Sequence, residues 1–248
     1  GKSSMDRALW ITWYNLPEEG REAYLAWLHG TYIPALLARP GYLWAAHYAS
    51  LEEQKIPRRQ SGRKFTTDDP AVPRGDRFIL IVGAKDANVF GHPLPREIHA
   101  ELPTEGRKMI AMRIGERVNI MTEAARVEGP EANDYKEGMT LAPCIQMGSF
   151  QAAWQDEDDA LAWYARWRMP SMGKLKGCVR CRKLASVSGW AKQAILYEFT
   201  APEARDHFLH SHEDGDSNRE WTDKIIAKLM HAPGSANVGR RIWPPVTS

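Results

Sequence analysis

The sequence predicts an α+β protein in which one β-α-β-β-α-β unit occurs twice and the two units close into a single barrel. Three observations lead to this fold class: an internal repeat, the order of strands and helices in each copy, and the sheet face that each copy would leave bare. Residues 8–50 align with residues 144–186 without a gap, at an offset of 136 positions. The shared residues include Leu25-Ala26-Trp27 with Leu161-Ala162-Trp163, Pro34 with Pro170, and Gly41 with Gly177. Matched halves of this length tend to pack as a pseudo-dimer.

The first copy opens with a strand and a helix. Ala8–Tyr14 is rich in β-branched and aromatic residues and stops at Asn15-Leu16-Pro17, which predicts a strand. Pro17–Gly20 then opens a helix whose apolar residues keep helical spacing to about Ala38. Pro40-Gly41 ends this helix.

The rest of the first copy supplies three more strands and a second helical region. Tyr42–Ala49 is expected to be a strand, and Leu51–Asp76 is a polar loop with three prolines. Arg77–Ala84 is a continuous apolar run, typical of a strand covered on both faces. A less regular helical region follows over Asn88–Arg117, and Val118–Val127 is the last strand.

The second copy repeats this order. Its expected strands are Cys144–Phe150, Cys178–Ser186, Ala194–Phe199 and Ala236–Trp243, and its helices are Asp156–Met172 and Pro202–Leu229. Each copy is thus the split β-α-β arrangement of ferredoxin-like folds, which has one bare sheet face. Two such faces can bury each other inside one chain. We therefore place the first repeat at residues 5–129, a linker at 130–142 and the second repeat at 143–248.

The bulk composition excludes several classes of protein. The 33 basic and 31 acidic side chains give a net charge of +2, which provides no broad electrostatic footprint for nucleic acid. No apolar run approaches the ~18–20 residues that cross a bilayer, and the N-terminal residues lack the apolar core of a signal peptide. Three cysteines, an odd number, indicate a reducing cytoplasm. Ten tryptophans suit a pocket for a flat, apolar ligand.

Strand alternation divides the side chains of the first two strands of each copy into two sets. The set assigned to the helix-covered face is Leu9, Ile11, Trp13, Leu43, Ala45 and His47, with Ile145, Met147, Ser149, Val179, Cys181 and Lys183. The set assigned to the barrel interior is Trp10, Thr12, Tyr14, Trp44, Ala46 and Tyr48, with Gln146, Gly148, Phe150, Arg180, Arg182 and Leu184. Aromatic rings of one half then meet guanidinium groups of the other. Either an interface built on Arg–Trp stacking or an anion site walled by rings would result.

One stretch resembles a known family signature. Residues 27–34 (WLHGTYIP), followed by Leu37 and Pro40-Gly41-Tyr42, are similar to the Trp-Tyr-x-x-Glu-His-x-Pro, Leu and Pro-Gly-Phe pattern of EthD-like dimeric α+β barrel proteins. The second copy repeats it in degraded form at residues 163–170 (WYARWRMP), with Gly177 after it. The resemblance implies an intramolecular dimeric α+β barrel. It fixes no single reaction, because that superfamily includes cofactor-free monooxygenases, lactone isomerases, polyketide cyclases, dehydratases and heme enzymes.

The histidine of that signature is absent from both copies. Tyr32 occupies its position in the first copy and Arg168 in the second. His29 lies one helical turn earlier, from which it can approach the same cleft. If the signature histidine carries chemistry in the family, that chemistry has moved or changed in this chain.

His47 is the first candidate for a general acid or base, because imidazole titrates near neutral pH. Tyr32 is expected to polarise a substrate oxygen, with His29 as a polar partner. The alternative for His47 is a half-buried ring at a strand end. The expected pocket walls are Trp13, Tyr14 and Trp44, and the expected binders of a carboxylate or phenolate are Arg168, Arg182 and Lys183.

Two further clusters contain residue types that bind metals. His207, His210 and His212 form the densest set of ligand-type residues, and whether they bind a metal or a heme stays open. Cys178 and Cys181 have C-x-x-C spacing, but residues three apart on a strand are expected to face opposite sides, which argues against zinc. No nucleotide-binding loop or flavin fingerprint is present, so no cofactor is predicted.

The sequence therefore predicts a cytoplasmic, cofactor-independent lyase or isomerase that uses acid–base chemistry on an aromatic or polyketide-like small molecule. Two alternatives remain: a heme-binding barrel enzyme, with His210 as the axial candidate, and a non-catalytic binding protein for apolar metabolites. No nucleic-acid or membrane partner is predicted. The sequence leaves the substrate, the working half and pairing into a homodimer open.

Overall fold

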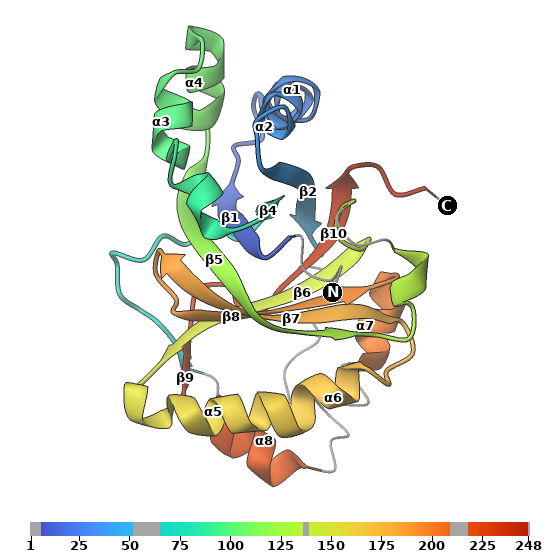
Figure 1. The fold of residues 1–248 in the computed structure, drawn as a ribbon. Coiled ribbons are helices and arrows are strands. Elements are labelled where there is room, and N and C mark those ends of the chain that lie inside the picture. The colour runs from blue at the N-terminus through green and yellow to red at the C-terminus, as the bar shows by residue number, and fades with distance from the viewer. Residues whose placement is uncertain (1–5, 52–64, 136–138, 209–217, 248) are drawn as a thin grey trace.

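The computed structural model of the chain describes residues 6–51, 65–135, 139–208 and 218–247 (Figure 1). Within these residues, eight antiparallel strands close into a barrel in the order β10-β2-β4-β1-β5-β7-β8-β6, and β6 pairs with β10 to complete it. The barrel strands are β1 (Ala8–Asn15), β2 (Tyr42–Ser50), β4 (Phe78–Ala84), β5 (Ile114–Glu128), β6 (Cys144–Ala152), β7 (Cys178–Ser188), β8 (Gln193–Phe199) and β10 (Asn237–Trp243). Two short strands, β3 (Phe65–Thr66) and β9 (Leu229–His231), extend the sheet beyond β6.

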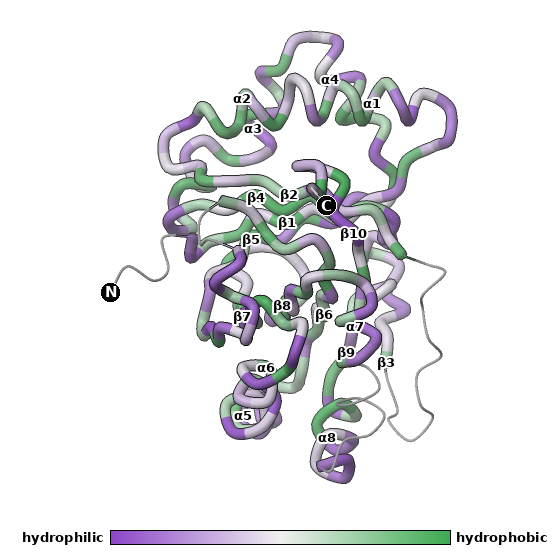
Figure 2. The backbone as a smooth tube through the Cα atoms, turned by 90° about the vertical axis from the view of Figure 1, so that its right-hand side faces the viewer, coloured by the Kyte–Doolittle hydropathy of each residue, from purple (hydrophilic) through white to green (hydrophobic). Residues whose placement is uncertain are grey.

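Helices cover the barrel on two opposite sides (Figures 1 and 2). The first side carries α1 (Arg21–Trp27), the π-helix η1 (Leu28–Tyr32), α2 (Ile33–Leu37), η3 (Ala87–Phe90), α3 (Pro95–Ala100) and α4 (Thr104–Ala111). The second carries η5 (Trp154–Asp156), α5 (Glu157–Trp163), the π-helix η6 (Tyr164–Arg168), α6 (Met169–Met172), α7 (Pro202–Phe208) and α8 (Arg219–Ile226). The short η4 (Ala132–Asp134) precedes β6. Among the described residues, no helix is long and apolar enough to cross a membrane.

The strand registers confirm the predicted fold of two matched units. In the first copy, Trp10 and Ala45 both pair with Val82 on the strand between them. In the second copy, the residues 136 positions further along, Gln146 and Cys181, both pair with Tyr197. The last strand of each unit also pairs with the other unit, because β5 pairs with β7 and β10 pairs with β2. The two units thereby form one closed barrel, although the repeat boundaries given above stay a prediction.

The predicted faces are wrong for the first strand of each copy and correct for the second, apart from Leu43, which packs against the interior cluster. Trp10 and Tyr14 pack in the core under the helices, whereas Trp13 lies in the barrel interior. Likewise Phe150 packs under the helices and Met147 lies in the interior. Paired residues on neighbouring strands share a face, and the register aligns Trp10 and Tyr14 with the side of Ala45. That alignment is set by β4, which pairs with both β1 and β2. The alternation of side chains along β1 or β2 alone does not reveal it.

Three element boundaries also differ from expectation. The expected helix over 88–117 ends at Ala111, and β5 begins earlier than expected, at Ile114. The expected helix over 202–229 consists of α7 and α8 as far as it is described, and its last residue begins β9.

A register shift between Cys178 and Arg180 places both cysteines of the C-x-x-C pair in the same core cluster, not on opposite sides of the sheet. Burial raises the pKa of Cys178 to about 12, so neither a thiolate nor a zinc ligand is favoured there.

Candidate active site

A hydrogen-bonded chain of three side chains lies under the helices of the first half. His47, on β2, is fully buried, and its Nε2 lies 2.6 Å from the hydroxyl of Tyr14 on β1. Its Nδ1 lies 2.8 Å from Nε2 of His29, which is half-buried on η1. The chain therefore connects a buried phenol to an imidazole at the edge of the core. A proton taken up at one end can be passed to the other by shifting each shared hydrogen.

The surroundings keep these imidazoles neutral. Burial lowers the pKa of His47 well below its usual value, and the charges of His29 and Arg113 lower it further. Burial also lowers the pKa of His29. Burial raises the pKa of the Tyr14 phenol well above 10, so that group keeps its proton. At neutral pH the chain thus holds two neutral imidazoles next to a protonated phenol.

A buried arginine lies against the same tyrosine. Arg113 precedes β5, and its Cζ is 4.8 Å from the ring centroid of Tyr14 and 5.7 Å from that of Tyr32. Its Nε donates to the hydroxyl of Tyr24 at 2.9 Å, and its Nη1 contacts Glu116 at 3.1 Å. Its Nη2 is buried and makes no hydrogen bond to any residue that the structure describes. The site therefore holds a fixed positive charge with one unused donor.

Tyr32 forms a second tyrosine–histidine pair at this site. Its hydroxyl lies 2.6 Å from Nε2 of His99, a half-buried residue of α3. Burial and the Arg113 charge lower the pKa of His99 to about 4. Burial raises the pKa of Tyr32, despite the nearby Arg113 charge. The tyrosines of two tyrosine–histidine pairs thus lie within 6 Å of one guanidinium group.

The sequence places His29 and Tyr32 on a π-helical turn. The π-helix at residues 28–32 recurs at residues 164–168, at the repeat offset of 136, and each is followed by a proline near the start of the next helix. Pro34 has no N–H to donate to the carbonyl four residues earlier, which weakens α-helical pairing at this point. Single π-helical turns within α-helices are frequent at functional sites.

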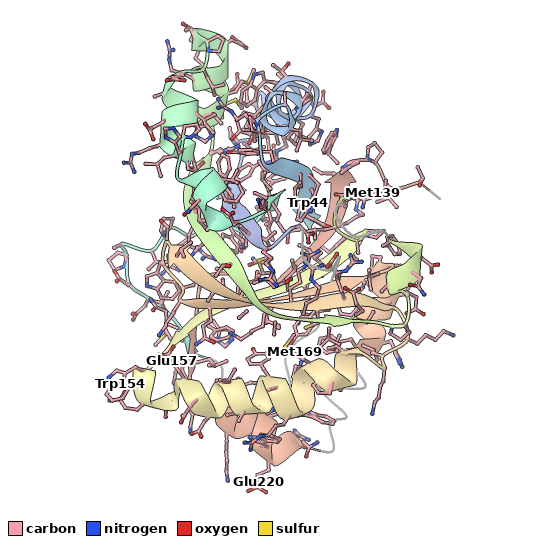
Figure 3. All side chains as sticks on the ribbon, viewed as in Figure 1. Trp44, Met139, Trp154, Glu157, Met169 and Glu220 are labelled. Carbon is pink, nitrogen blue, oxygen red and sulfur yellow. The ribbon has the colours of Figure 1, made fainter. Side chains whose placement is uncertain are left out.

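Other predicted site residues lie elsewhere in the fold. Trp13 and Trp44 are in the barrel interior, on the opposite face of the sheet from His47 (Trp44 is labelled in Figure 3). The ring of Trp13 is stacked by Arg117 at 3.8 Å. Arg182 lies 5.9 Å from the ring of Trp44, and ion pairs with Asp6 and Glu198, both at 3.1 Å, neutralise it. The roles of Trp13, Trp44 and Arg182 in substrate binding stay predictions.

Arg168 and Lys183 lie under the helices of the second half. The guanidinium of Arg168 stacks on Trp163 at 4.6 Å, and the ammonium of Lys183 donates to Gln193. His207 is exposed on α7, and His210 and His212 lie outside the described residues. The described part of the chain contains no group of three or more residues arranged to hold a metal ion.

The sequence predicts three residues of the hydrogen-bonded site but not its charged centre. His47, His29 and Tyr32 are the expected catalytic groups, and Tyr14 is an expected wall. Arg113 carries no comparable signal, because it lies in a stretch with the pattern of an irregular helix and its packing on three tyrosines depends on long-range contacts. His99 has only one sequence signal, its position in the helical region that covers the first sheet.

Neither a comparison with protein families nor a search of curated proteins finds a match. Solved structures do match the fold over nearly the whole chain. An anthrone oxidase-like protein aligns with a TM-score of 0.61 at 7% identity, over 99% of this chain and 97% of that chain. A candidate monooxygenase from Fusobacterium nucleatum aligns with a TM-score of 0.60 at 8% identity, over 96% and 93%. A dye-decolorizing peroxidase from Bacteroides thetaiotaomicron aligns with a TM-score of 0.58 at 8% identity, over 97% and 93%. The chain therefore has the dimeric α+β barrel fold, formed here within one polypeptide.

His47 cannot bind a heme iron in this arrangement, because both of its ring nitrogens are engaged with Tyr14 and His29. His210, the axial candidate, lies outside the described residues. The heme-binding alternative therefore stays a prediction.

Proposed function

We propose that the first half is a cofactor-independent acid–base enzyme, a lyase or isomerase acting on a small aromatic or polyketide-like substrate. The observation that carries this proposal is the chain His29–His47–Tyr14 beside Arg113. Neutral imidazoles with lowered pKa values are available as bases at neutral pH. Activity on any substrate is part of the proposal, because structural likeness at such low identity extends only to the fold.

The hydrogen-bonded chain explains how a buried histidine takes part in proton transfer. When His29 donates its Nε2 proton to His47, and His47 donates to Tyr14, Nδ1 of His29 carries a free lone pair. A proton taken from substrate at Nδ1 of His29 is then shared with His47. Arg113 disfavours a lasting positive charge there, so the proton is readily given back.

Return of the proton distinguishes the two reaction types. Removal of a proton from a carbon next to a carbonyl leaves an enolate. An isomerase returns that proton to a different carbon of the enolate. A lyase delivers it to a departing oxygen, while the C–O bond breaks and a C=C bond forms. Both reactions conserve atoms and electrons without an added oxidant.

Aromatic rings flank the outer end of the chain. The imidazole of His29 stacks on the half-buried indole of Trp243, with centroids 6.2 Å apart and planes inclined by 25°. Trp27, also half-buried, lies 5.2 Å from the ring of Tyr32. Flat rings next to a base favour a planar, apolar substrate.

Deuterium exchange tests proton abstraction whatever product the enzyme finally forms. Anthrone, a tricyclic ketone with an acidic methylene group, is incubated in deuterium oxide under nitrogen, and loss of the methylene signal is followed by proton NMR. We expect the enzyme to accelerate exchange and His47→Gln to lower the enzymatic rate at least 100-fold. The matched control is His231→Gln, which removes a buried imidazole from the second half.

Three outcomes would contradict the proposal. An unchanged rate in His47→Gln would remove this chain from the mechanism. Tight binding of anthrone without exchange would instead indicate a binding protein. Enzyme-dependent oxygen consumption when the incubation is repeated in air would indicate an oxygenase in place of a lyase or isomerase.

A further inference from the structure

Lys183 is a buried lysine that the chemistry proposed for the first half does not use. It lies on β7 under the helices of the second half, at the position that His47 has in the first copy, and it is 7% exposed. Its Nζ donates a hydrogen bond of 2.5 Å to Oε1 of Gln193 on β8. Its ammonium group forms no ion pair with any residue that the structure describes. The charged form of this lysine is therefore costly, because it has left water without gaining a carboxylate.

Two aromatic rings lie beside the amine. Nζ of Lys183 is 5.3 Å from the ring centroid of Phe150 on β6 and 5.1 Å from that of Tyr164 on η6. Ring faces attract a cation at this distance. They therefore favour an iminium ion formed from the amine as well as the ammonium ion itself, because the two ions carry the same charge.

The burial of Lys183 makes its amine reactive near neutral pH. Burial lowers the pKa of Lys183 to about 8, and the nearby Cys181 and Glu157 oppose this only in part. Glu157, labelled in Figure 3, pairs instead with Lys192 at 2.7 Å and accepts from the amide of Gln193 at 3.2 Å. At pH 7 an amine of this pKa is about one-tenth neutral, against roughly one part in 2,500 for an ordinary lysine. Only the neutral amine has the lone pair that attacks an electrophile.

A small pocket, partly open to solvent, lies next to this amine. Phe150 and Tyr164 line the pocket, and so does Ile195, which is the register partner of Lys183 across β7 and β8. The pocket volume is about 50 Å³. A water molecule needs about 10–15 Å³ of such volume, so the pocket has room for about three or four non-hydrogen atoms. The lysine stem is flexible, so that Nζ can turn from Gln193 towards the pocket.

We propose that Lys183 is a nucleophile that forms a Schiff base with a short aldehyde of three or four non-hydrogen atoms, such as acetaldehyde. The neutral amine attacks the carbonyl carbon, a C–N bond forms, and the carbonyl oxygen takes up the proton that the amine loses. This carbinolamine accepts a proton from solvent and releases water, which leaves a C=N bond and a positive charge beside Phe150 and Tyr164. No oxidant or reductant is consumed. The site is independent of the proton transfer proposed for the first half.

Reductive trapping on the full chain tests the proposal. The protein is incubated at pH 7 with acetaldehyde and sodium cyanoborohydride, which delivers hydride to the iminium carbon and leaves a stable N-ethyl group. Peptide mapping by mass spectrometry then gives the rate of ethylation at each lysine. The internal reference is Lys174, which is exposed on the turn before β7. We expect Lys183 to be ethylated at least tenfold faster than Lys174, because its neutral fraction is roughly 200-fold larger.

The length of the aldehyde tests the pocket without any change to the chain. Hexanal has more non-hydrogen atoms than the pocket can hold, whereas an exposed lysine accepts it freely. We expect the rate at Lys183, relative to the rate at Lys174, to fall at least tenfold when hexanal replaces acetaldehyde.

Gln193→Glu tests the activation of the amine with little change of shape. The new carboxylate stands where Nζ of Lys183 now has a neutral acceptor, so it stabilises the ammonium form and raises the pKa. We expect ethylation of Lys183 to be at least tenfold slower in this variant and ethylation of Lys174 to be unchanged. The matched control is Gln155→Glu, the same substitution at an exposed glutamine on η5, which should keep the wild-type rate at Lys183.

The outcomes separate the proposal from a purely structural role. Fast, size-limited ethylation of Lys183 that Gln193→Glu slows and Gln155→Glu retains supports the site. If Lys174 is ethylated while Lys183 stays unmodified, then Lys183 is a packed cation and the proposal is wrong. Equal rates with the two aldehydes overturn it as well, and this comparison decides even if Gln193→Glu does not fold. Deuterium exchange on anthrone reports on the first half alone, so failure of either proposal is recognised without the other.

Discussion

Replacing Glu198 by glutamine should strongly destabilise the protein, because this carboxylate lies at the centre of a buried ionic cluster. Glu198 has no exposed surface, and its Oε2 accepts from Nε of Arg182 at 3.1 Å. Its Oε1 accepts from the backbone N–H of Ala142 at 3.0 Å and lies 3.5 Å from Nη1 of Arg180. The carboxylate therefore connects β8, β7 and the segment that precedes β6.

The expected loss follows from the charges left behind. Breaking a buried ion pair by removing one partner costs about 3–5 kcal/mol, since an uncompensated charge remains. The low end applies here, because Asp6 still contacts Arg182 at 3.1 Å and Glu128 still contacts Arg180 at 3.2 Å. We therefore expect Glu198→Gln to lower the free energy of unfolding by about 3 kcal/mol. For a chain of this size that corresponds to a decrease in Tm of about 6–12 °C.

Urea unfolding of the two proteins, followed by tryptophan fluorescence, measures this difference. The control is Glu220→Gln, at an 87% exposed carboxylate whose partner is Lys224, four residues on along α8 (Figure 3). An exposed pair of this kind contributes little, so the control should unfold like the wild type. If Glu198→Gln costs no more than Glu220→Gln, then water reaches the cluster and the reasoning from burial is wrong.

Three further predictions concern the histidine chain and the repeat. The lowered pKa of His47 means that its contribution to stability is complete above about pH 6.5, the value of the unfolded state, and is lost as pH falls below it. Urea titrations from pH 5 to 8 should therefore show a shallower pH slope in His47→Gln, by up to about 1.4 kcal/mol per pH unit, and an unchanged slope would contradict this. Tyr14→Phe leaves Nε2 of buried His47 unpaired and should cost about 1–3 kcal/mol in the same assay, more than Tyr32→Phe, whose partner is half-buried. Gly177→Ala should lower Tm more than Gly41→Ala, because both glycines have positive φ but an added Cβ lies 2.4 Å from Cβ of Ala204 at Gly177 and 2.8 Å from Cγ2 of Val89 at Gly41; equal Tm values would argue against the larger clash.

The fold was predictable from the sequence because its main signals are local and occur twice. Gly41 and Gly177 have φ values of +84° and +92°, so both copies need glycine at the same turn before a strand. Pro34 and Pro170 follow matched π-helical turns. These glycines and prolines mark the ends of helices and strands independently of tertiary packing. Because they recur at one offset, they also indicate that the order of helices and strands is the same in both copies. The cytoplasmic location and the homodimer stay predictions.

The site was only partly predictable, because its geometry depends on registers between distant strands. Tyr14 reaches His47 because β4 aligns β1 with β2, which local alternation does not specify. Arg113 joins the site from outside the aligned repeat, far beyond His47 in the chain. Arg113 lies over three tyrosine rings and has one buried N–H group without a hydrogen bond. None of these contacts produces a periodic pattern in the sequence.

The two copies have kept one backbone and exchanged its chemistry at matched positions. Lys183, Phe150 and Ala165 stand at the positions of His47, Tyr14 and His29, so the second half has no counterpart of the proton relay that we propose for the first. Arg168 stands at the position of Tyr32. A lysine and an arginine cannot hold the neutral, shared-proton arrangement that two imidazoles form, because their ordinary charged states repel a further proton. The proton transfer that we propose therefore needs side chains that, at the matched positions, only the first copy has.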